Sequence, residues 1–446
     1  MGPDQGHSTL EVDWEAQLAN APEPYTPKDQ KDANAPEVPY SELPEALTLE
    51  HHPPSPAHPV PVICGLRKRT FYIVLGLVLL VAVGAGVGGG VGTSSSSDTS
   101  APGSSSSSSD GSVPSSDGSS SSPHVTLLPT TNLASINYTD EADVEHNLVY
   151  YQLSSKAIYQ SHWNSADTTW KVSIVANDTD KIMENTPLSA DLWRNNATLR
   201  NIDVYWLEPG GMIRGLTKHH SQGWIDNGVN NQYHTGKMAT YAKECDSCYN
   251  NNVVVYNNDH LYWLQTQPTW VQQAIANAPI PASGSDLSLK PVYSSDGAKH
   301  MVLHMNSKAT GNLTQVVWNG AKWASAQTLP TSISANASIA AFTAGYEDDV
   351  AQDFTIQVLT TDPLDVAGRV TLTAYHVSTD TWTSARDVAG FEDILDGSPL
   401  AVNQAGRVYG LVAGADGAPQ IAEWAWNADN ASYTRMGNVS IPVPAS

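Results

Sequence analysis

The stretch that decides the fold is Ile202-Asp203-Val204-Tyr205-Trp206, followed by Gly211-Met212-Ile213-Arg214-Gly215 and then by Gly223-Trp224. Two short apolar or alternating runs, separated by turn residues, predict consecutive β-strands. A degenerate copy of this unit recurs six times between about residues 146 and 446. The leading runs of the six copies are Leu148–Tyr151, Ile202–Trp206, Val253–Tyr256, Met301–His304, Phe354–Val358 and Arg407–Tyr409.

An aromatic landmark follows the second strand-like run of each unit. The six landmarks are Trp170, Trp224, Trp270, Trp323, Trp382 and Tyr433, which lie 54, 46, 53, 59 and 51 residues apart. A repeat of about 40–55 residues made of short strands is typical of a β-propeller, in which small sheets stack around an axis and hide their edges. Residues 125–446 are therefore predicted to form an all-β, six-bladed propeller, with the landmark aromatics packed between blades.

A hydrophobic run precedes the repeats. Residues 71–92, FYIVLGLVLLVAVGAGVGGGVG, carry no charge. As a helix they are about 33 Å long, enough to cross a hydrocarbon core of about 30 Å. The run begins 70 residues into the chain, which predicts a retained transmembrane helix rather than a cleaved signal peptide. Arg67-Lys68-Arg69 abuts it and no basic residue follows before Lys156, so residues 1–70 are expected in the cytoplasm and the repeats in an extracellular or lumenal space.

Two polar segments flank this predicted single-pass anchor. Residues 1–70 are rich in proline and carboxylates without hydrophobic periodicity, which predicts a disordered cytoplasmic tail. Residues 93–124 are dominated by serine, which predicts a flexible stalk between the membrane and the propeller.

Two features of the predicted outer domain fit an oxidising, glycosylating compartment. All the Asn-X-Ser/Thr glycosylation sequons follow the membrane run, at Asn137, Asn177, Asn196, Asn312, Asn336, Asn430 and Asn438. Cys245 and Cys248 form a Cys-Asp-Ser-Cys motif. Because this domain contains no further cysteine and no suitably spaced histidine, we expect a local disulfide rather than a zinc or redox site.

The composition excludes some classes of function. A formal net charge of −23 argues against nucleic-acid binding, because phosphates need lysine and arginine partners. The sequence contains neither a Gly-X-Ser-X-Gly nor a His-Glu-X-X-His motif, and no acidic box recurs in the repeats. Neither an enzymatic activity nor a metal or other cofactor is therefore expected.

The repeat pattern resembles the fungal fucose-specific lectin family. Blades of that family read approximately Ile-Arg-Val-Tyr, then Gly-X-Ile-X-Glu, then Gly-X-Trp, and the second repeat quoted above has the same cadence. Thr186–Ala190 and Ser398–Val402 also resemble segments near the ends of the family's blades. By contrast, none of the thirteen tryptophans is followed by aspartate, as WD40 blades would require. The resemblance covers about 300 residues and implies a six-bladed propeller that binds carbohydrate.

The resemblance also implies where a sugar would bind. In the family each pocket lies between neighbouring blades, where the arginine and glutamate bond sugar hydroxyls and an aromatic ring covers the apolar face of the sugar. The arginine position is occupied by Leu148, Asp203, Val254, Val302, Thr355 and Arg407 in the six repeats. The glutamate position is occupied by Gln160, Gly215, Trp263, Gln315, Leu372 and Glu423.

Only the sixth repeat keeps both charged residues of this motif. Arg407 and Glu423 are therefore the candidate carbohydrate-binding residues. The aromatic partner is expected to be Trp426, Tyr433, or a residue of the adjoining first blade, Trp163 or Trp170. The alternative for Arg407 and Glu423 is a surface ion pair that contributes under about 1 kcal/mol.

These observations lead to two functional hypotheses. The first is a single-pass membrane protein that displays a fucose-lectin-like propeller, with most of its sugar pockets degenerate and fucosylated glycans as its ligands. The second is a propeller that binds no sugar and serves as a scaffold for protein contacts at the cell surface or in the secretory pathway.

Overall fold

The computed structural model describes the chain in segments. These are residues 62–63, 66–67, 126–196, 199–219, 223–229, 236–241, 252–266, 270–276, 278–293, 299–324, 326–346, 354–365 and 369–442. The chain divides into two compact units, Met1–Val113 and Pro114–Ser446.

In the first unit, β1 (Val62–Ile63) pairs antiparallel with β2 (Leu66–Arg67). This ladder lies within the tail predicted to be disordered. The predicted membrane helix at 71–92 and the stalk at 93–124 lie outside the described residues. No helix in the described part of the chain is long and apolar enough to cross a membrane.

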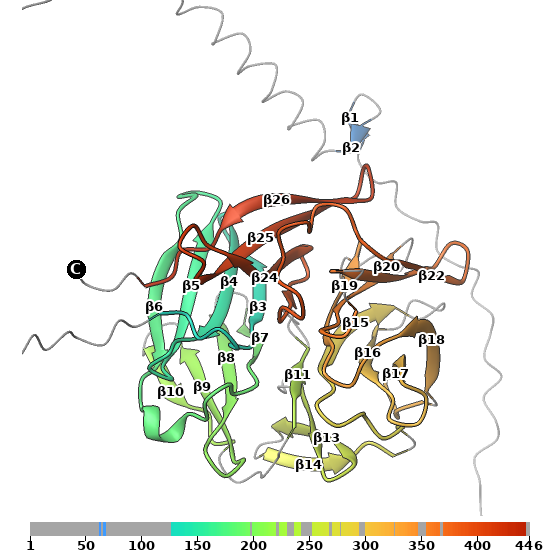
Figure 1. The fold of residues 1–446 in the computed structure, drawn as a ribbon, viewed down its shortest axis with the longest axis horizontal. Helices are drawn as coiled ribbons and strands as arrows, with labels where there is room; N and C mark the ends of the chain where they lie inside the picture. Colours follow the sequence, from blue (N-terminus) through green and yellow to red (C-terminus); the bar gives the residue numbers. More distant parts are fainter. Residues whose placement is uncertain are drawn as a thin grey trace, which may run out of the picture. The chain divides into compact units, whose positions relative to one another are not determined.

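The second unit consists of six antiparallel four-stranded sheets, each formed by four consecutive strands (Figure 1). Blade 1 comprises β3 (Ala134–Thr139), β4 (Glu145–Gln152), β5 (Ile158–Asn164) and β6 (Lys171–Ala176), and blade 2 comprises β7 (Ser189–Asn196), β8 (Leu199–Leu207), β9 (Ile213–His219) and β10 (Gly223–Asp226). Blade 3 comprises β11 (Met238–Thr240), β12 (Asn252–Asn257), β13 (His260–Thr266) and β14 (Trp270–Ala274), and blade 4 comprises β15 (Leu287–Tyr293), β16 (Lys299–Asn306), β17 (Asn312–Trp318) and β18 (Gln327–Ser332). Blade 5 comprises β19 (Ser338–Ala344), β20 (Thr355–Thr361), β21 (Thr371–His376) and β22 (Thr381–Ala385), and blade 6 comprises β23 (Ala401–Val402), β24 (Arg407–Ala413), β25 (Pro419–Asn427) and β26 (Ser432–Asn438). A short 3₁₀ helix, η1 (Thr179–Lys181), connects blades 1 and 2.

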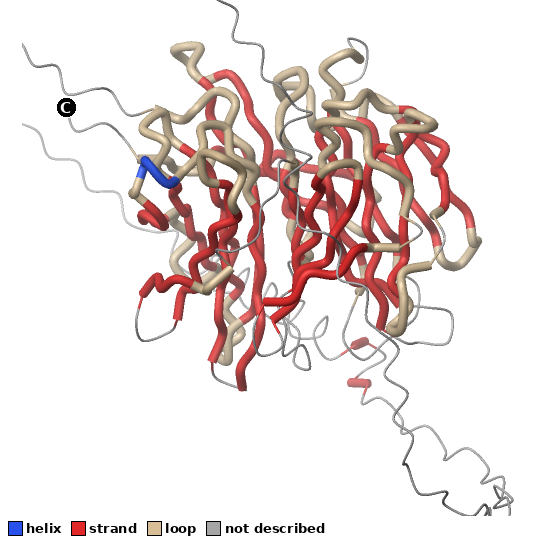
Figure 2. Tube along the Cα trace, turned by 90° about the horizontal axis from the view of Figure 1, so that it is seen from below, coloured by secondary structure: helices blue, strands red, loops and turns tan. Residues whose placement is uncertain are grey.

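The first strand of each sheet lies nearest the axis, and the ring closes between blades 6 and 1. Each inner strand packs against the next, from β3 through β7, β11, β15 and β19 to β23, and β23 packs against β3. Seen from the side, the strands run across the thickness of the molecule and the turns lie at their ends (Figure 2). No strand is exchanged at the closure, so side chains hold it: Asn403 Nδ2 donates to Asn147 Oδ1 (2.8 Å), and Ser161 Oγ donates to the Ser440 carbonyl.

The prediction of an all-β six-bladed propeller is confirmed. Each blade, however, begins one strand earlier than the predicted repeat unit. The leading runs identified in the sequence form the second strand of each blade. The inner strands, such as Ser338–Ala344, are rich in small and hydroxylated residues, so they carry a weak hydrophobic signal. Thr186–Ala190 and Ser398–Val402 therefore lead into the inner strands of blades 2 and 6 rather than ending the preceding blades.

The landmark aromatics pack between blades, as predicted. Each lies in or next to the fourth strand of its blade. Trp170, Trp270, Trp382 and Tyr433 contact the second strand of the preceding blade, and Trp323 contacts Trp263 in the third strand of blade 3. Trp270 meets Tyr205 edge-on with 6.0 Å between ring centroids, and Trp382 meets His304 in the same way at 6.4 Å. These contacts bury the two faces that a single sheet cannot bury alone.

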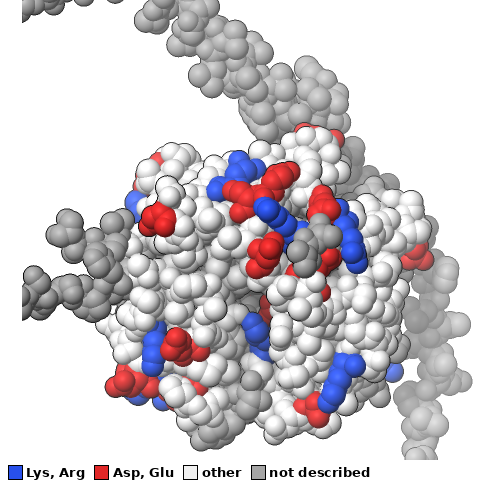
Figure 3. Space-filling model, viewed as in Figure 1, with Lys and Arg blue, Asp and Glu red and all other residues white. Residues whose placement is uncertain are grey.

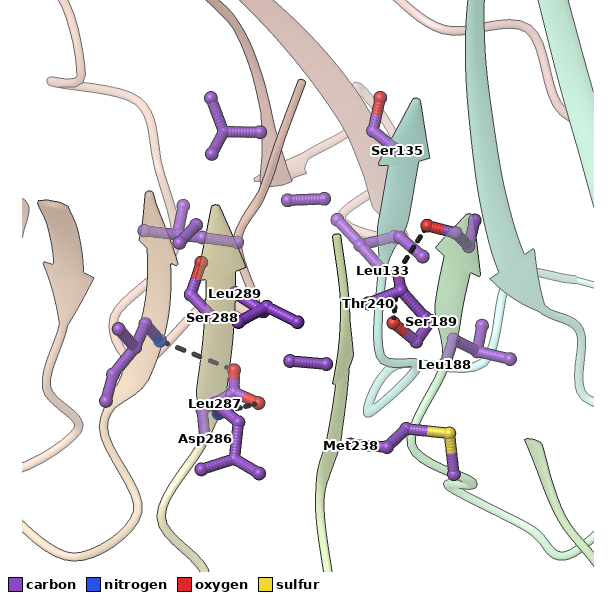
Figure 4. Close-up of a pocket in the computed structure, with 18 of the residues that line it drawn as sticks. Leu133, Ser135, Leu188, Ser189, Met238, Thr240, Asp286, Leu287, Ser288 and Leu289 are labelled. Atoms are coloured by element: carbon purple, nitrogen blue, oxygen red, sulfur yellow. Dashed lines mark hydrogen bonds between the residues drawn. The ribbon is translucent and has the colours of Figure 1, made fainter. Parts of the chain in front are cut away.

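The inner strands line a narrow axial cavity of about 70 Å³. Figure 4 shows hydroxyl groups of four blades on its wall, those of Ser135, Ser189, Thr240 and Ser288. Ser189 and Thr240 are joined by a hydrogen bond of 2.9 Å. Lys290 also lines the cavity and is buried, with Nζ 3.4 Å from the Val402 carbonyl. Burial lowers the pKa of Lys290 to about 8.

Candidate functional site

Arg407 and Glu423 lie on the face of blade 6 that is turned toward blade 1. In the β24–β25 ladder Arg407 pairs with Ala425, and Tyr409 pairs with Glu423. Side chains two residues apart on a strand share a face, and directly paired residues do too. Arg407, Tyr409 and Glu423 therefore point to the same side of the sheet, and Tyr409 packs there against apolar residues of blade 1.

The three side chains form one polar cluster. Arg407 Nη1 lies 3.6 Å from Glu423 Oε1, and the Tyr409 hydroxyl donates to the same oxygen at 3.1 Å. The side chains of Arg407 and Glu423 are only 19% and 11% exposed. They are thus a largely buried, diagonal pair, which differs from the surface ion pair considered as the alternative.

Burial and charge act in opposite directions on Glu423. Burial raises its pKa above the ordinary value, while Arg407 and the Tyr409 hydroxyl oppose that increase. Burial also raises the pKa of Tyr409, so its hydroxyl stays protonated and remains a donor. The cluster therefore offers a cationic donor and a carboxylate acceptor side by side.

Blade 1 supplies the aromatic side of the crevice. The guanidinium carbon of Arg407 lies 5.8 Å from the centre of the Trp163 ring. Trp163 pairs with Asn147 in the β4–β5 ladder, and Asn147 bonds to Asn403 of blade 6, so this face of blade 1 is turned toward blade 6. Trp170 meets Tyr409 edge-on, with 6.3 Å between ring centroids.

Trp426 and Tyr433, two of the predicted sugar-binding residues, are not part of this cluster. They pair with each other between β25 and β26 and lie one residue out of phase with Glu423 and Ala425, on the opposite face of the sheet. There Tyr433 donates to Gln357 of blade 5. The assignment of both to the same pocket as Arg407 is corrected by this alternation, and Trp163 is the better-placed candidate aromatic.

The register also corrects two positions in the other repeats. In blade 6, Glu423 pairs with Tyr409, which follows the arginine position, Arg407, by two residues. The residues at the glutamate positions of blades 1, 2 and 4 pair in the same way with the residue two after the arginine position. In blade 5 this position is Ala374, opposite Gln357, rather than Leu372. In blade 3 Trp263 lies directly opposite Val254. Hairpins of different length shift these positions, which sequence spacing alone does not reveal.

The remaining predicted site residues are scattered over the molecule. Asn177, Asn336, Asn430 and Asn438 are exposed, Asn137 and Asn312 are half-buried, and the side chain of Asn196 lies outside the described residues. Asn137 is close to the candidate site, because its Oδ1 accepts a hydrogen bond from the Ala405 backbone at 3.2 Å. Cys245 and Cys248 lie outside the described residues, so their disulfide stays a prediction. No cluster of three or more metal-ligating side chains occurs in the described segments.

No family model and no curated protein matches the sequence, but solved structures match the fold. The fucose-specific lectin of Aleuria aurantia has a TM-score of 0.58 at 15% identity, and the match covers 72% of this chain and 99% of the lectin. AofleA from Arthrobotrys oligospora has a TM-score of 0.52 at 18% identity, with 72% and 92% covered. The SapL1 lectin, solved with α-methyl fucoside, has a TM-score of 0.53 at 15% identity, with 71% and 99% covered. The chain therefore has the six-bladed β-propeller fold found in fungal fucose-specific lectins.

Proposed function

We propose that the propeller is a carbohydrate-binding module whose sugar site is the crevice between blades 6 and 1. The observation that carries the proposal is the placement of Arg407, Glu423 and Trp163 at one blade boundary, with the guanidinium 3.6 Å from the carboxylate and 5.8 Å from the indole. Its support from other proteins is the shared fold with lectins described as fucose-specific.

The chemistry of the cluster suits a neutral sugar with fixed hydroxyl groups. Arg407 donates only, and ionised Glu423 accepts only, so adjacent hydroxyls of a ring can bond to one as acceptor and to the other as donor. Trp163 offers an apolar ring for the C–H face of the sugar at small entropic cost. Fucose is the proposed ligand.

The other blade boundaries are proposed to be poor sites for the same ligand. At the arginine and glutamate positions blade 1 has Leu148 and Gln160, and blade 4 has Val302 and Gln315. Neither pair supplies a charged donor or acceptor, so charge-assisted bonds to hydroxyls are not available there.

The test is a glycan array probed with the full-length chain in detergent, carrying fucosylated and matched non-fucosylated sugars. We expect fucose-dependent binding that Arg407→Ala abolishes and that Glu423→Gln weakens at least about tenfold, because each change removes a charge-assisted hydrogen bond. Arg386→Ala is the matched control, since that side chain is 65% exposed and belongs to an ion pair in blade 5.

Two results would contradict the proposal. One is fucose binding that is unchanged in Arg407→Ala. The other is no binding by a correctly folded chain, which would favour the alternative of a scaffold for protein contacts. An Asn137→Gln variant is included in the array, because a glycan on Asn137 beside Ala405 would cover the crevice and mask its activity.

We also propose that residues 71–92 anchor the chain in a membrane, with residues 1–70 in the cytoplasm and the propeller outside or in a lumen. The uncharged run and the basic triplet before it support this topology. Protease treatment of sealed microsomes should leave the propeller intact, and glycosidase treatment should lower its apparent mass. If the protease instead digested the propeller and left residues 1–70 intact, the proposed orientation in the membrane would be reversed.

A further inference from the structure

A second crevice, between blades 1 and 2, contains a cavity of about 250 Å³. Its walls come from the end of β6, from η1 and from β8, β9 and β10. Residues central to its chemistry are Asp178, Lys181, Trp206, Arg214, Trp224 and Asp226. The volume is just below the range of about 300–1,000 Å³ for drug-sized ligands, which suits a single sugar ring.

This cavity lies at a different blade boundary from the Arg407 site and near the other end of the strands. Arg407 begins β24 and pairs with Ala425 near the end of β25, far from the hairpin that joins these strands. Trp206 pairs with Arg214 next to the hairpin that joins β8 and β9. The cavity therefore reaches the opposite end of the strands. Leu148 and Gln160, which occupy the arginine and glutamate positions of blade 1, do not line it, and Gly215, at the glutamate position of blade 2, adds no side chain to its wall.

Two cations of the second crevice, Arg214 and Lys181, are ion-paired within it. Arg214 Nε bonds to Glu208, and Arg214 Nη1 lies 3.5 Å from Asp226 Oδ2. Lys181 Nζ lies 2.8 Å from Asp178 Oδ2. Side chains of opposite sign also lie next to one another on this part of the surface, over β9 and β10 (Figure 3, lower left). Lys181 and Arg214 are thus already neutralised by carboxylates, so neither offers uncompensated positive charge to a phosphate, sulfate or carboxylate ligand, whereas a neutral polar ligand needs none.

The apolar wall of the cavity is formed by two indoles. Trp206 is buried, and its Nε1 donates to the Lys181 carbonyl at 3.1 Å, which fixes the ring. Trp224 is half-buried, and Lys218 Nζ lies 5.8 Å from its ring centre. A ligand for this crevice therefore needs hydroxyl groups for Arg214 and Asp226 and a C–H face for an indole.

We propose that the crevice between blades 1 and 2 holds one neutral pyranose residue, bonded by Arg214 and Asp226 and packed against Trp224. The inference goes beyond the proposed function, because it uses neither Arg407 nor Glu423. Two sources share this chemistry. One is the core of a glycan attached to Asn177, which lies in the cavity wall and is exposed. The other is a residue of a free oligosaccharide.

The experiment measures saturation transfer by NMR from the full-length chain to N-acetylglucosamine and methyl β-galactoside, with galactose 6-sulfate as the anionic comparison. Four proteins are compared: wild type, Asn177→Gln, Asn177→Gln with Asp226→Asn, and Asn177→Gln with Arg407→Ala. Asp226→Asn is a mild change, because the side chain is 52% exposed and an amide oxygen can still accept the 2.7 Å bond from the Gly228 backbone. Thermal unfolding of Asn177→Gln is compared with that of Asn336→Gln, which removes another exposed sequon.

We expect a neutral sugar to bind Asn177→Gln at least about tenfold more weakly when Asp226→Asn is added, and equally well when Arg407→Ala is added. The sulfated sugar should not bind at this site. If the glycan on Asn177 occupies the cavity, wild type should show no Asp226-dependent binding of added sugar. Asn177→Gln should then lower Tm more than Asn336→Gln does. A free source predicts the same Asp226-dependent binding in wild type. The inference is overturned if no variant shows saturation transfer that depends on Asp226. It is also overturned if only Arg407→Ala abolishes binding, a result that would support the proposed function instead.

Discussion

The crevice between blades 6 and 1 and the crevice between blades 4 and 5 have the same backbone register but opposite chemistry. Tyr409 faces Glu423 in the first, and His304 faces Gln315 in the second. Glu423 is paired with Arg407 and accepts from Tyr409. The ring of His304 is fully buried and interacts with the neutral side chain of Gln315. One boundary thus carries a compensated charge, and the other carries a neutral polar pair.

The difference shows that the arginine and glutamate depend on each other. A carboxylate buried without a cation is costly, so a repeat without the arginine gains stability from a neutral residue at the glutamate position. Three other blades with confirmed register lack both residues. At the arginine and glutamate positions they have Leu148 and Gln160, Asp203 and Gly215, and Val302 and Gln315.

The largest effect is expected from breaking the charged pair. Arg407→Leu places at this position the residue found in blade 1 and leaves Glu423 buried without its cation. We expect a loss of about 3 kcal/mol in the free energy of unfolding at pH 7, measured by urea titration. Arg407→Leu combined with Glu423→Gln should recover most of that loss, because the resulting pair is neutral. Equal losses in the single and double variants would show that the pair is not coupled.

The fold was predictable from the sequence because its signal repeats. Alternation in the second strand, as in Ile202–Trp206, and the landmark aromatics fixed the number of blades and their packing. The inner strands escaped prediction because their small and hydroxylated residues, as in Ser338–Ala344, carry little hydrophobic periodicity. They are buried by neighbouring blades, which is a tertiary effect.

The candidate site was predictable only in part. Arg407 and Glu423 could be found because the motif survives in the sixth repeat, and the structure places them together. Trp426 was assigned to them from its closeness in sequence, but alternation along β25 turns it toward Phe342 of blade 5. A Cβ added at Gly406 would lie 2.9 Å from Trp426 and 3.2 Å from Phe342. The position of Trp163 depends on ring closure, which joins residues some 250 positions apart.

The second prediction concerns the pH dependence of the neutral crevice. Burial lowers the pKa of His304 from 6.5 to about 4. The unfolded chain therefore binds more protons between pH 6.5 and pH 4, and the free energy of unfolding falls as the pH is lowered through that range. A shift of this size corresponds to about 3 kcal/mol. The raised pKa of Glu423 gives the opposite sign, with stability lost as the pH rises above its ordinary value of 4.5.

Urea titrations at pH 7 and pH 4.5 separate these contributions. His304→Gln should lose less stability on acidification than wild type does, because glutamine does not titrate. His162, whose pKa burial also lowers to about 4, still contributes to acid sensitivity in both proteins and does not affect their difference. An unchanged loss in His304→Gln would mean that His304 takes up its proton without unfolding the blade boundary.

The smallest effect is expected from placing a carboxylate in the neutral crevice. Gln315→Glu keeps the shape of the side chain, which is buried, but Val302 at the arginine position supplies no cation. We expect a loss of about 2 kcal/mol in the free energy of unfolding at pH 7, and a much smaller loss at pH 4.5, where protonation removes the buried charge. Urea titration at both pH values gives the difference, with Gln327→Glu as the control because that residue is exposed on the neighbouring strand. The same loss at both pH values would assign the cost to packing, and the link between the arginine and glutamate positions would then need another explanation.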